Sequence, residues 1–247
     1  ETMAREVMGA FNTDQPLLFE AGTGVGKSLA YLIPAIFLAI HKKRQGIIAT
    51  HTISLQEQIK DKDLEICRSL FSKVPELKVY KGFKVAFLVG KGNYLCTTRL
   101  DTAIAQKTEL IPSDGQRELE RIVQWSLDTK VGIRQELVPP PSFDVWDWVS
   151  ADSSACSKKN CDPKVCHYQK ARAKISDSHL VILNHSLLFS LLGSGMPVPK
   201  GRGILYPEDF VILDEGHTVP AVATEHYGMS LNSYGVNRLL SFLYNPK

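Results

Sequence analysis

The sequence lacks any apolar stretch long enough to cross a membrane. Its longest apolar run, from Leu29 to Ile40, contains Pro34 and falls short of the roughly 20 residues that a membrane span needs. The chain also opens without a signal-peptide pattern. We therefore expect a cytoplasmic protein with no membrane partner, associated with the nucleoid in a bacterium or nuclear in a eukaryote.

Cysteine is scarce and the net charge is small. Five cysteines, odd in number and unevenly placed, exclude a secreted disulfide framework. A net charge of +3 is too small to indicate a nucleic-acid partner, so such a partner must be argued from local clusters. With 44% hydrophobic and 22% charged residues, the 247-residue chain has the composition of one or two globular domains.

A glycine-rich turn, Glu20–Ser28, lies between the apolar triplet Leu17–Phe19 and an apolar segment that is predicted to be helical. It fits the pattern G-x-x-x-x-G-K-[S/T], with Ala21 in the place of the first glycine. Backbone N–H groups of such a turn point inward and the following helix adds positive potential, so the turn suits a polyphosphate. The residues expected around the phosphates of ATP are Gly22, Thr23, Gly24, Val25, Gly26, Lys27 and Ser28.

A magnesium ion bound with the phosphates needs oxygen ligands from the turn and from a second segment of the chain. Lys27 is predicted to reach the β- and γ-phosphates, and the Ser28 hydroxyl to complete the shell of Mg²⁺. The apolar run Phe210–Leu213 ends in Asp214 and Glu215, at the strand edge where α/β sheets bind ligands. We expect Asp214 to hold Mg²⁺ and Glu215 to position and polarise the attacking water. Taken without the other motifs, Asp214 and Glu215 could instead be an acidic pair that caps the start of a surface helix.

Apolar runs of strand length alternate with helical segments, which predicts βαβ units and a parallel sheet. Between Cys96 and about Lys174 this alternation stops, so we expect a mainly helical insertion in an α/β sheet domain. The expected strands are Leu17–Phe19, Ile47–Thr50, Val85–Val89, Leu180–Leu183 and Phe210–Leu213.

Four cysteines of the insertion can close around one metal centre. Cys96, Cys156, Cys161 and Cys166 are separated by 59, 4 and 4 residues. Such a quartet suits structural zinc and a 4Fe–4S cluster alike, although the two-residue knuckles that favour zinc are absent. The fifth, Cys67, falls at helical spacing among apolar residues and is predicted to be buried in the core.

The last part of the insertion is basic. Six basic residues stand against one acidic residue between Cys156 and Lys174. Some of this charge would offset a thiolate cluster or form a solvated face, and the functional interpretation is a rim for single-stranded DNA with Tyr168 available for stacking. The candidate contacts are Lys158, Lys159, Lys170 and Arg172.

Several motifs together resemble a known family. Asp214-Glu215-Gly216-His217 resembles the Asp-Glu-x-His box of superfamily-two helicases, and Ala21–Ser28 looks like their first motif. Thr52, Leu55 and Gln58 match the spacing of a motif that touches the nucleic-acid backbone in those enzymes. The cysteine trio, the Gly90–Cys96 segment and Asn184–Leu188 are similar to the XPD/DinG-like iron–sulfur helicases, and to the bacterial DinG-like branch in particular.

This resemblance implies a RecA-like domain, a 4Fe–4S cluster rather than zinc at the quartet, and Thr52 and Gln58 as nucleic-acid contacts. It also implies a monomeric, ATP-dependent DNA helicase that moves 5′ to 3′ on single-stranded DNA and opens forked duplex DNA. The alternative is a non-enzymatic or zinc-stapled nucleic-acid-binding P-loop module.

The resemblance further predicts how the chain is divided. Both ends look cut, so we expect the front part of a longer enzyme that hydrolyses little ATP without its second RecA-like domain. The expected parts are 1–90 (first half of the ATPase domain), 91–178 (cluster insertion), 179–224 (second half, with the acidic box) and 225–247 (the start of a helical arch insertion).

Overall fold

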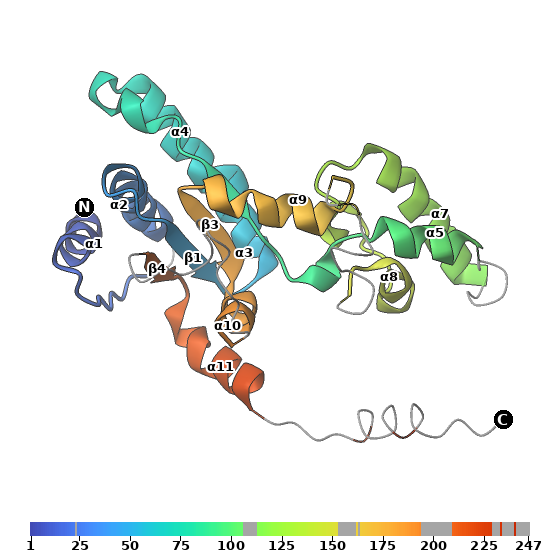
Figure 1. Cartoon of the computed structure of the whole chain (residues 1–247). Helices are drawn as coiled ribbons and strands as arrows, with labels where there is room; N and C mark the ends of the chain where they lie inside the picture. The colour runs from blue at the N-terminus through green and yellow to red at the C-terminus, as the bar shows by residue number, and fades with distance from the viewer. Residues whose placement is uncertain are drawn as a thin grey trace.

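The computed structural model describes residues 1–22, 24–105, 113–152, 162, 164–193, 209–228, 233 and 240. A four-stranded parallel sheet of order β2-β3-β1-β4 lies at its centre (Figure 1). The strands read as near-continuous apolar runs because helices cover both faces of the sheet. The predicted α/β class with a parallel sheet is confirmed. The strands are β1 (Gly46–Thr50), β2 (Val85–Phe87), β3 (Leu180–Asn184) and β4 (Phe210–Leu213).

One face of the sheet packs against the helices that flank the glycine-rich turn. Side chains alternate along a strand, so Ile48 joins this core while its neighbours Ile47 and Ala49 point to the other face. Cys67 is fully buried in the same core, as predicted, and burial raises the pKa of its thiol to about 11. The elements of this layer are α1 (Thr2–Thr13), α2 (Lys27–His41), α3 (Ile53–Gln58), the π-helical turn η1 (Ile59–Asp63), α4 (Leu64–Lys73) and η2 (Pro75–Tyr80).

Helix α2 is the central element of this layer. It is apolar on nearly all sides, as expected of a helix that is buried all round, and it runs through Pro34 without ending. Pro34 is itself among the buried residues of this helix.

The opposite face of the sheet is covered by shorter elements. Leu188 of α10 packs with Val181 and Leu183 of β3, and Tyr168 and Ala171 of α9 pack against the same cluster. These elements are α9 (His167–Ala173), η5 (Ile175–Asp177), α10 (His185–Gly193), η6 (Gly216–Thr218) and α11 (Val219–Tyr227).

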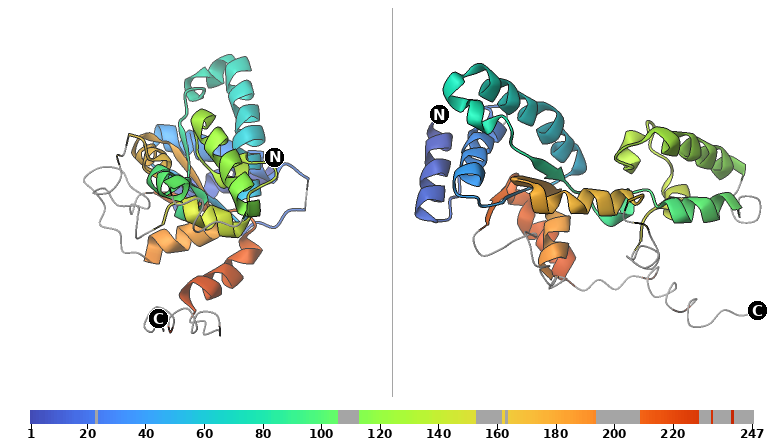
Figure 2. Two further views of the ribbon diagram at one scale, coloured as in Figure 1. Left: turned by 90° about the vertical axis from the view of Figure 1, so that its right-hand side faces the viewer. Right: turned by 45° about the horizontal axis from the view of Figure 1, so that its top comes forward.

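The insertion forms a helical lobe to one side of the sheet (Figures 1 and 2). Its own core includes Leu119 and Trp146. Two other aromatic residues of the lobe, Phe143 and Trp148, are 77% and 38% exposed. In a helix, residues two apart lie on different faces, so Trp146 and Trp148 cannot both point inward. The elements are η3 (Lys91–Asn93), α5 (Thr97–Ala105), α7 (Ser113–Asp128), η4 (Arg134–Glu136) and α8 (Phe143–Val149).

The strand predicted at Leu17–Phe19 is not formed. These residues are irregular, and Leu18 is 98% exposed. Within the described part of the chain β4 pairs with β1 alone, so no ladder includes residues 17–19. A β-strand forms only where its backbone hydrogen-bonds to a neighbouring strand. Pro16, directly before the triplet, has no N–H group that could donate such a hydrogen bond.

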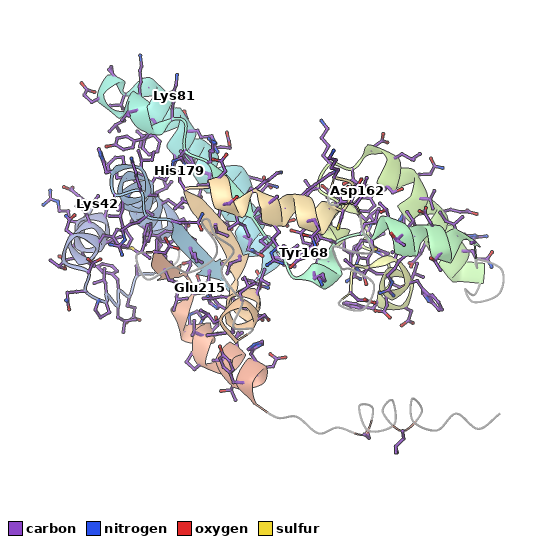
Figure 3. All side chains as sticks on the ribbon, in the orientation of Figure 1. Lys42, Lys81, Asp162, Tyr168, His179 and Glu215 are labelled. Carbon is purple, nitrogen blue, oxygen red and sulfur yellow. The ribbon has the colours of Figure 1, made fainter. Side chains whose placement is uncertain are left out.

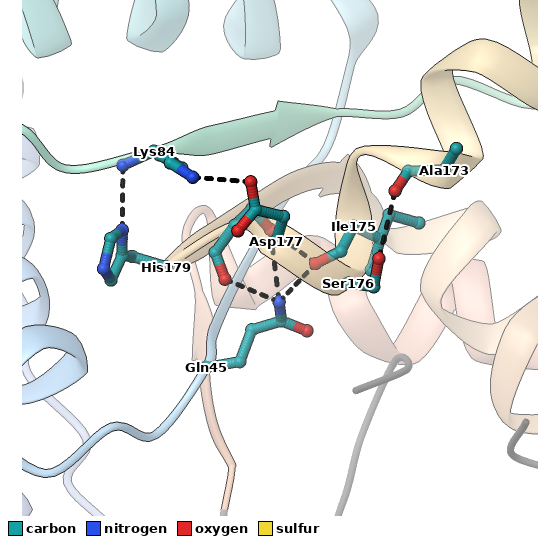
Figure 4. A network of polar contacts seen from close by, with 8 residues as sticks. Gln45, Lys84, Ala173, Ile175, Ser176, Asp177 and His179 are labelled. Atoms are coloured by element: carbon teal, nitrogen blue, oxygen red, sulfur yellow. Dashed lines mark hydrogen bonds and ion pairs between the residues drawn. The ribbon is translucent and has the colours of Figure 1, made fainter. Parts of the chain in front are cut away.

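The N-terminal edge of the sheet is closed by polar contacts (Figure 4). The buried Gln45 amide donates to the carbonyl oxygens of Ile175 at 2.7 Å and Ser178 at 2.8 Å. The Lys84 backbone N–H donates to Nδ1 of His179 at 2.9 Å. At the N-terminal ends of the strands, polar groups are thus used in contacts that join strands to loops. The predicted functional groups lie at the opposite, C-terminal ends of the strands. No helix in the described ranges is long and apolar enough to cross a membrane.

Candidate nucleotide site

The glycine-rich turn has the backbone that its sequence predicts. Gly24 and Gly26 have φ values of 74° and 82°, in the left-handed region that favours glycine. A Cβ at either position would meet no atom within 4 Å, so the backbone conformation rather than crowding requires glycine. Helix α2 begins at Lys27, directly after the turn, so the first N–H groups of the helix, which have no partner within it, lie next to the turn. Thr23 lies outside the described residues.

The acidic box continues the last strand. The Asp214 N–H donates to the carbonyl oxygen of Ala49 at 2.8 Å, which extends the ladder between β4 and β1 by one residue. Glu215 then turns the chain with φ 55° and ψ 42°, a left-handed conformation that is strained for a non-glycine residue. The Thr218 hydroxyl lies 2.9 Å from the Glu215 carbonyl oxygen, within hydrogen-bonding distance. Figure 3 shows Glu215 at this end of the sheet.

The structure brings the turn and the box together. Lys27 Nζ lies 3.5 Å from Glu215 Oε1, and these side chains are 26% and 30% exposed. The Tyr31 hydroxyl donates to Asp214 Oδ2 at 3.2 Å. His217 Nδ1 approaches the second Glu215 oxygen to 3.6 Å from the solvent side. Residues far apart in the sequence therefore meet at the C-terminal edge of the sheet, where ligands of α/β folds bind.

The two carboxylates are electrostatically unequal. Burial and the nearby charge of Glu215 raise the pKa of Asp214, whereas the hydrogen bond from Tyr31 opposes that rise. Burial also raises the pKa of Tyr31, so its phenol stays protonated and remains a donor. An Asp214 oxygen and the Ser28 hydroxyl are hard oxygen ligands of the kind that Mg²⁺ prefers, so the residues fit this ion.

His185 is a site residue to which the sequence assigned no role. It is fully buried where β3 meets α10, with Nε2 3.1 Å from the Ala49 oxygen and Nδ1 3.1 Å from Thr218 Oγ1. Burial lowers the pKa of this histidine, so it is neutral at pH 7. A carbonyl oxygen only accepts, so Nε2 carries the proton. His185 thus ties the end of β1 to the turn that holds Glu215.

An apolar cavity adjoins the glycine-rich turn. It has a volume of about 780 Å³ and lies between α1 and α2. Its size and apolar walls are typical of a small-molecule pocket. Its lining includes Arg5, Met8 and Asn12 from α1 and Val25, Leu29 and Ile33 from the turn and α2.

The predicted nucleic-acid contacts lie on α3 and α9. Thr52 caps α3 by accepting the Leu55 N–H at 3.2 Å, and both Thr52 and Gln58 are exposed. Lys170 is exposed on α9, whereas Arg172 is half-buried. Helix α9 lies beside α3, because Ile53 of α3 packs against the same buried cluster as residues of α9. Lys158 and Lys159 lie outside the described residues.

Tyr168 of α9 is packed rather than presented to solvent. Its ring meets that of Tyr94 edge-on at a centroid distance of 5.6 Å. Lys91 Nζ lies 5.4 Å from its centroid. The stacking role predicted for Tyr168 would require these neighbours to move.

Two of the four predicted metal-binding cysteines can be placed. Cys96 and Cys166 are both buried in one cluster, together with Val89 and Tyr94. Cys156 and Cys161 lie outside the described residues, within which no group of three or more metal-binding side chains gathers. The structure thus places Cys96 and Cys166 in one buried apolar cluster, and the quartet itself stays a prediction.

A parallel sheet with a glycine-rich turn before α2 and an acid pair after β4, joined through Lys27 and Glu215, is the arrangement of P-loop nucleotide-binding proteins. The DEAD/DEAH box helicase family matches residues 2–93. The fold is consistent with the RecA-like domain of such helicases.

Comparison with individual proteins indicates which helicases the chain is similar to. ATP-dependent DNA helicase YoaA of Haemophilus influenzae is 33% identical over 237 residues, which cover 94% of this chain and 34% of that protein. YoaA of Escherichia coli is 34% identical over 234 residues, with the same coverage of 94% and 34%. ATP-dependent DNA helicase DinG of E. coli is 33% identical over 231 residues, covering 87% and 30%. The chain is similar to these DinG-like helicases over most of its own length, and it spans about a third of the length of these relatives.

Proposed function

We propose that this chain supplies the ATP-binding wall of an ATP-dependent DNA helicase. The single observation that carries the proposal is the approach of Lys27 to Glu215 at 3.5 Å, because a lysine suited to phosphate then lies beside a carboxylate suited to position water. The relatives' names point the same way, since each is called an ATP-dependent DNA helicase. The cavity beside the turn offers room for the nucleoside part of ATP.

Each side chain has a defined task in this proposal. Lys27 leaves Glu215 and moves to the β- and γ-phosphates, which rest on the backbone N–H groups of the turn. Ser28 and Asp214 would hold Mg²⁺, which neutralises charge between these phosphates. Glu215, released from Lys27, accepts a hydrogen bond from the attacking water and aligns it with the γ-phosphate.

The test replaces Lys27 in the full-length protein. Lys27→Ala is expected to abolish detectable ATP binding and DNA-stimulated ATP hydrolysis, because the turn then loses the lysine charge that would neutralise the β- and γ-phosphates. Lys42→Ala is the matched control, since Lys42 is an exposed lysine at the opposite end of the same helix. DNA-stimulated hydrolysis that survives Lys27→Ala would sink the assignment. DNA binding by wild-type protein without ATP turnover would favour a non-enzymatic module instead.

We propose single-stranded DNA as the track and forked duplex DNA as the substrate of unwinding, with the 5′ to 3′ direction taken from the family resemblance. The exposed ends of α3, with Thr52 and Gln58, would contact the backbone. Lys170 and Arg172 of the neighbouring α9, together with Lys158 and Lys159, would add the positive charge that phosphates attract. A monomer suffices for this arrangement.

We propose that Cys96, Cys156, Cys161 and Cys166 hold a 4Fe–4S cluster. The shared burial of Cys96 and Cys166 supports a common centre, and the absence of two-residue knuckles disfavours zinc. In the resulting division of the chain, residues 91–178 form the cluster insertion between the two parts of the ATPase domain, 1–90 and 179–224, and residues 225–247 begin the arch. Anaerobically purified protein should contain iron and sulfide in equal amounts, whereas zinc in their place would overturn the proposal.

A further inference from the structure

The hydroxyl of Tyr31 contacts Asp214, one of the two side chains that the proposed function assigns to magnesium, and Tyr31 lies on the same helix as the other, Ser28. Tyr31 follows Ser28 by three residues on α2, so both occupy one face of the helix. Its hydroxyl donates to Asp214 Oδ2 at 3.2 Å. The nearby Ser28 side chain counteracts part of the rise in the pKa of the Tyr31 phenol.

Core packing alone does not explain this tyrosine. The side chain is only 3% exposed, and a phenylalanine would fill the same space without the cost of burying a hydroxyl. Tyr31 has a second acidic neighbour in Asp63, whose charge also acts on its phenol. Asp63 is buried at the end of the π-helical turn η1, in the segment that continues from α3. The hydroxyl therefore lies next to Asp214, which is proposed to hold magnesium, and within the electrostatic reach of Asp63.

We infer that Tyr31 is a positioning residue for the magnesium–nucleotide site, whose hydroxyl fixes Oδ2 of Asp214 and leaves the other oxygen for the ion's shell. A carboxylate accepts several hydrogen bonds at once, so binding to Tyr31 does not exhaust Asp214. A side chain that is held in place before the ligand arrives loses less freedom on binding, and affinity for the metal rises accordingly. This inference rests on the proposed function.

The experiment compares Tyr31→Phe with Tyr80→Phe in the full-length protein. Tyr80 is a matched control because it is also buried in the main core and its hydroxyl hydrogen-bonds to His41, near the far end of α2. Mn²⁺ serves as the probe, and its affinity for the protein–ADP complex is measured by electron paramagnetic resonance. Tyr31→Phe is expected to weaken Mn²⁺ binding about ten-fold, the usual effect of losing a hydrogen bond to a charged group. Tyr80→Phe is expected to leave it unchanged.

Two further readouts separate positioning from general damage. ADP binding without metal should be the same in both variants and in the wild type. The ATPase rate of Tyr31→Phe should return to within about two-fold of wild type at saturating Mg²⁺, because the hydroxyl affects metal affinity rather than the reacting atoms. Equal Mn²⁺ affinity in the two variants would overturn the inference. Wild-type protein that binds no nucleotide would instead overturn the proposed function.

Discussion

Replacing Glu215 with glutamine removes the negative partner of Lys27 and keeps the size of the side chain. Two opposite effects are expected. Hydrolysis should fall because the amide cannot accept a proton or align water as a carboxylate does. Nucleotide binding should rise because Lys27 no longer has to leave an ion pair before it reaches the phosphates.

The size of the gain follows from the geometry of the pair. At 3.5 Å two unit charges attract by about 1 kcal/mol in water and by about 5 kcal/mol at an effective dielectric constant of about 20. Both side chains are more than a quarter exposed, and pairs of this kind contribute at most about 1 kcal/mol when measured. ATP affinity should therefore increase by no more than about five-fold.

A fluorescent ATP analogue measures the affinity, and phosphate release measures turnover. Glu215→Gln should bind up to about five-fold tighter, with the gain shrinking at high salt, and should hydrolyse ATP at least about 100-fold more slowly. Glu225→Gln on α11 changes net charge equally and should alter neither value. Weaker binding by Glu215→Gln, or turnover close to wild type, would refute the assignment of Lys27 and Glu215 to opposite sides of the γ-phosphate.

Two other substitutions test the metal centre and the sheet. Cys96→Ala should lower the iron content of anaerobically purified protein, whereas Cys67→Ala, which removes a buried thiol from the main core, should leave it unchanged. Iron lost equally from both variants would contradict the quartet. Gly46→Ala should destabilise the fold by about 1–3 kcal/mol and lower the melting temperature by several degrees, because a Cβ there would lie 2.4 Å from the Phe210 ring. Gly82→Ala, with open space around its Cβ, should melt close to wild type in the same thermal scan.

The sequence predicts those parts of the fold that are determined by neighbouring residues in the chain. Strands β1, β3 and β4 lie within a residue of their expected ranges, because a strand covered on both faces needs a continuous apolar run. The glycine-rich turn was equally predictable, because a residue with left-handed backbone is usually glycine. The order of the motifs along the chain then indicated that Lys27 and Glu215 would meet.

The failures and omissions depend on contacts between distant segments. Leu17–Phe19 has the composition of a strand, but composition does not supply a partner strand. In the sequence, Tyr31 is indistinguishable from the other residues on the apolar face of α2. The role of its hydroxyl becomes apparent only from its hydrogen bond to Asp214. His185 likewise gains its role from Ala49 and Thr218, which no spacing rule connects to it.

The outer edge of β4 has a consequence for how the protein behaves in solution. In the described ranges β4 is paired on one side only, and Val211 and Leu213 are 40% and 45% exposed. A short apolar strand with unsatisfied N–H and C=O groups is a template for any extended segment that reaches it. An extended segment that added to this edge would continue the ladder of β4, and charged residues at these two positions should oppose such an addition.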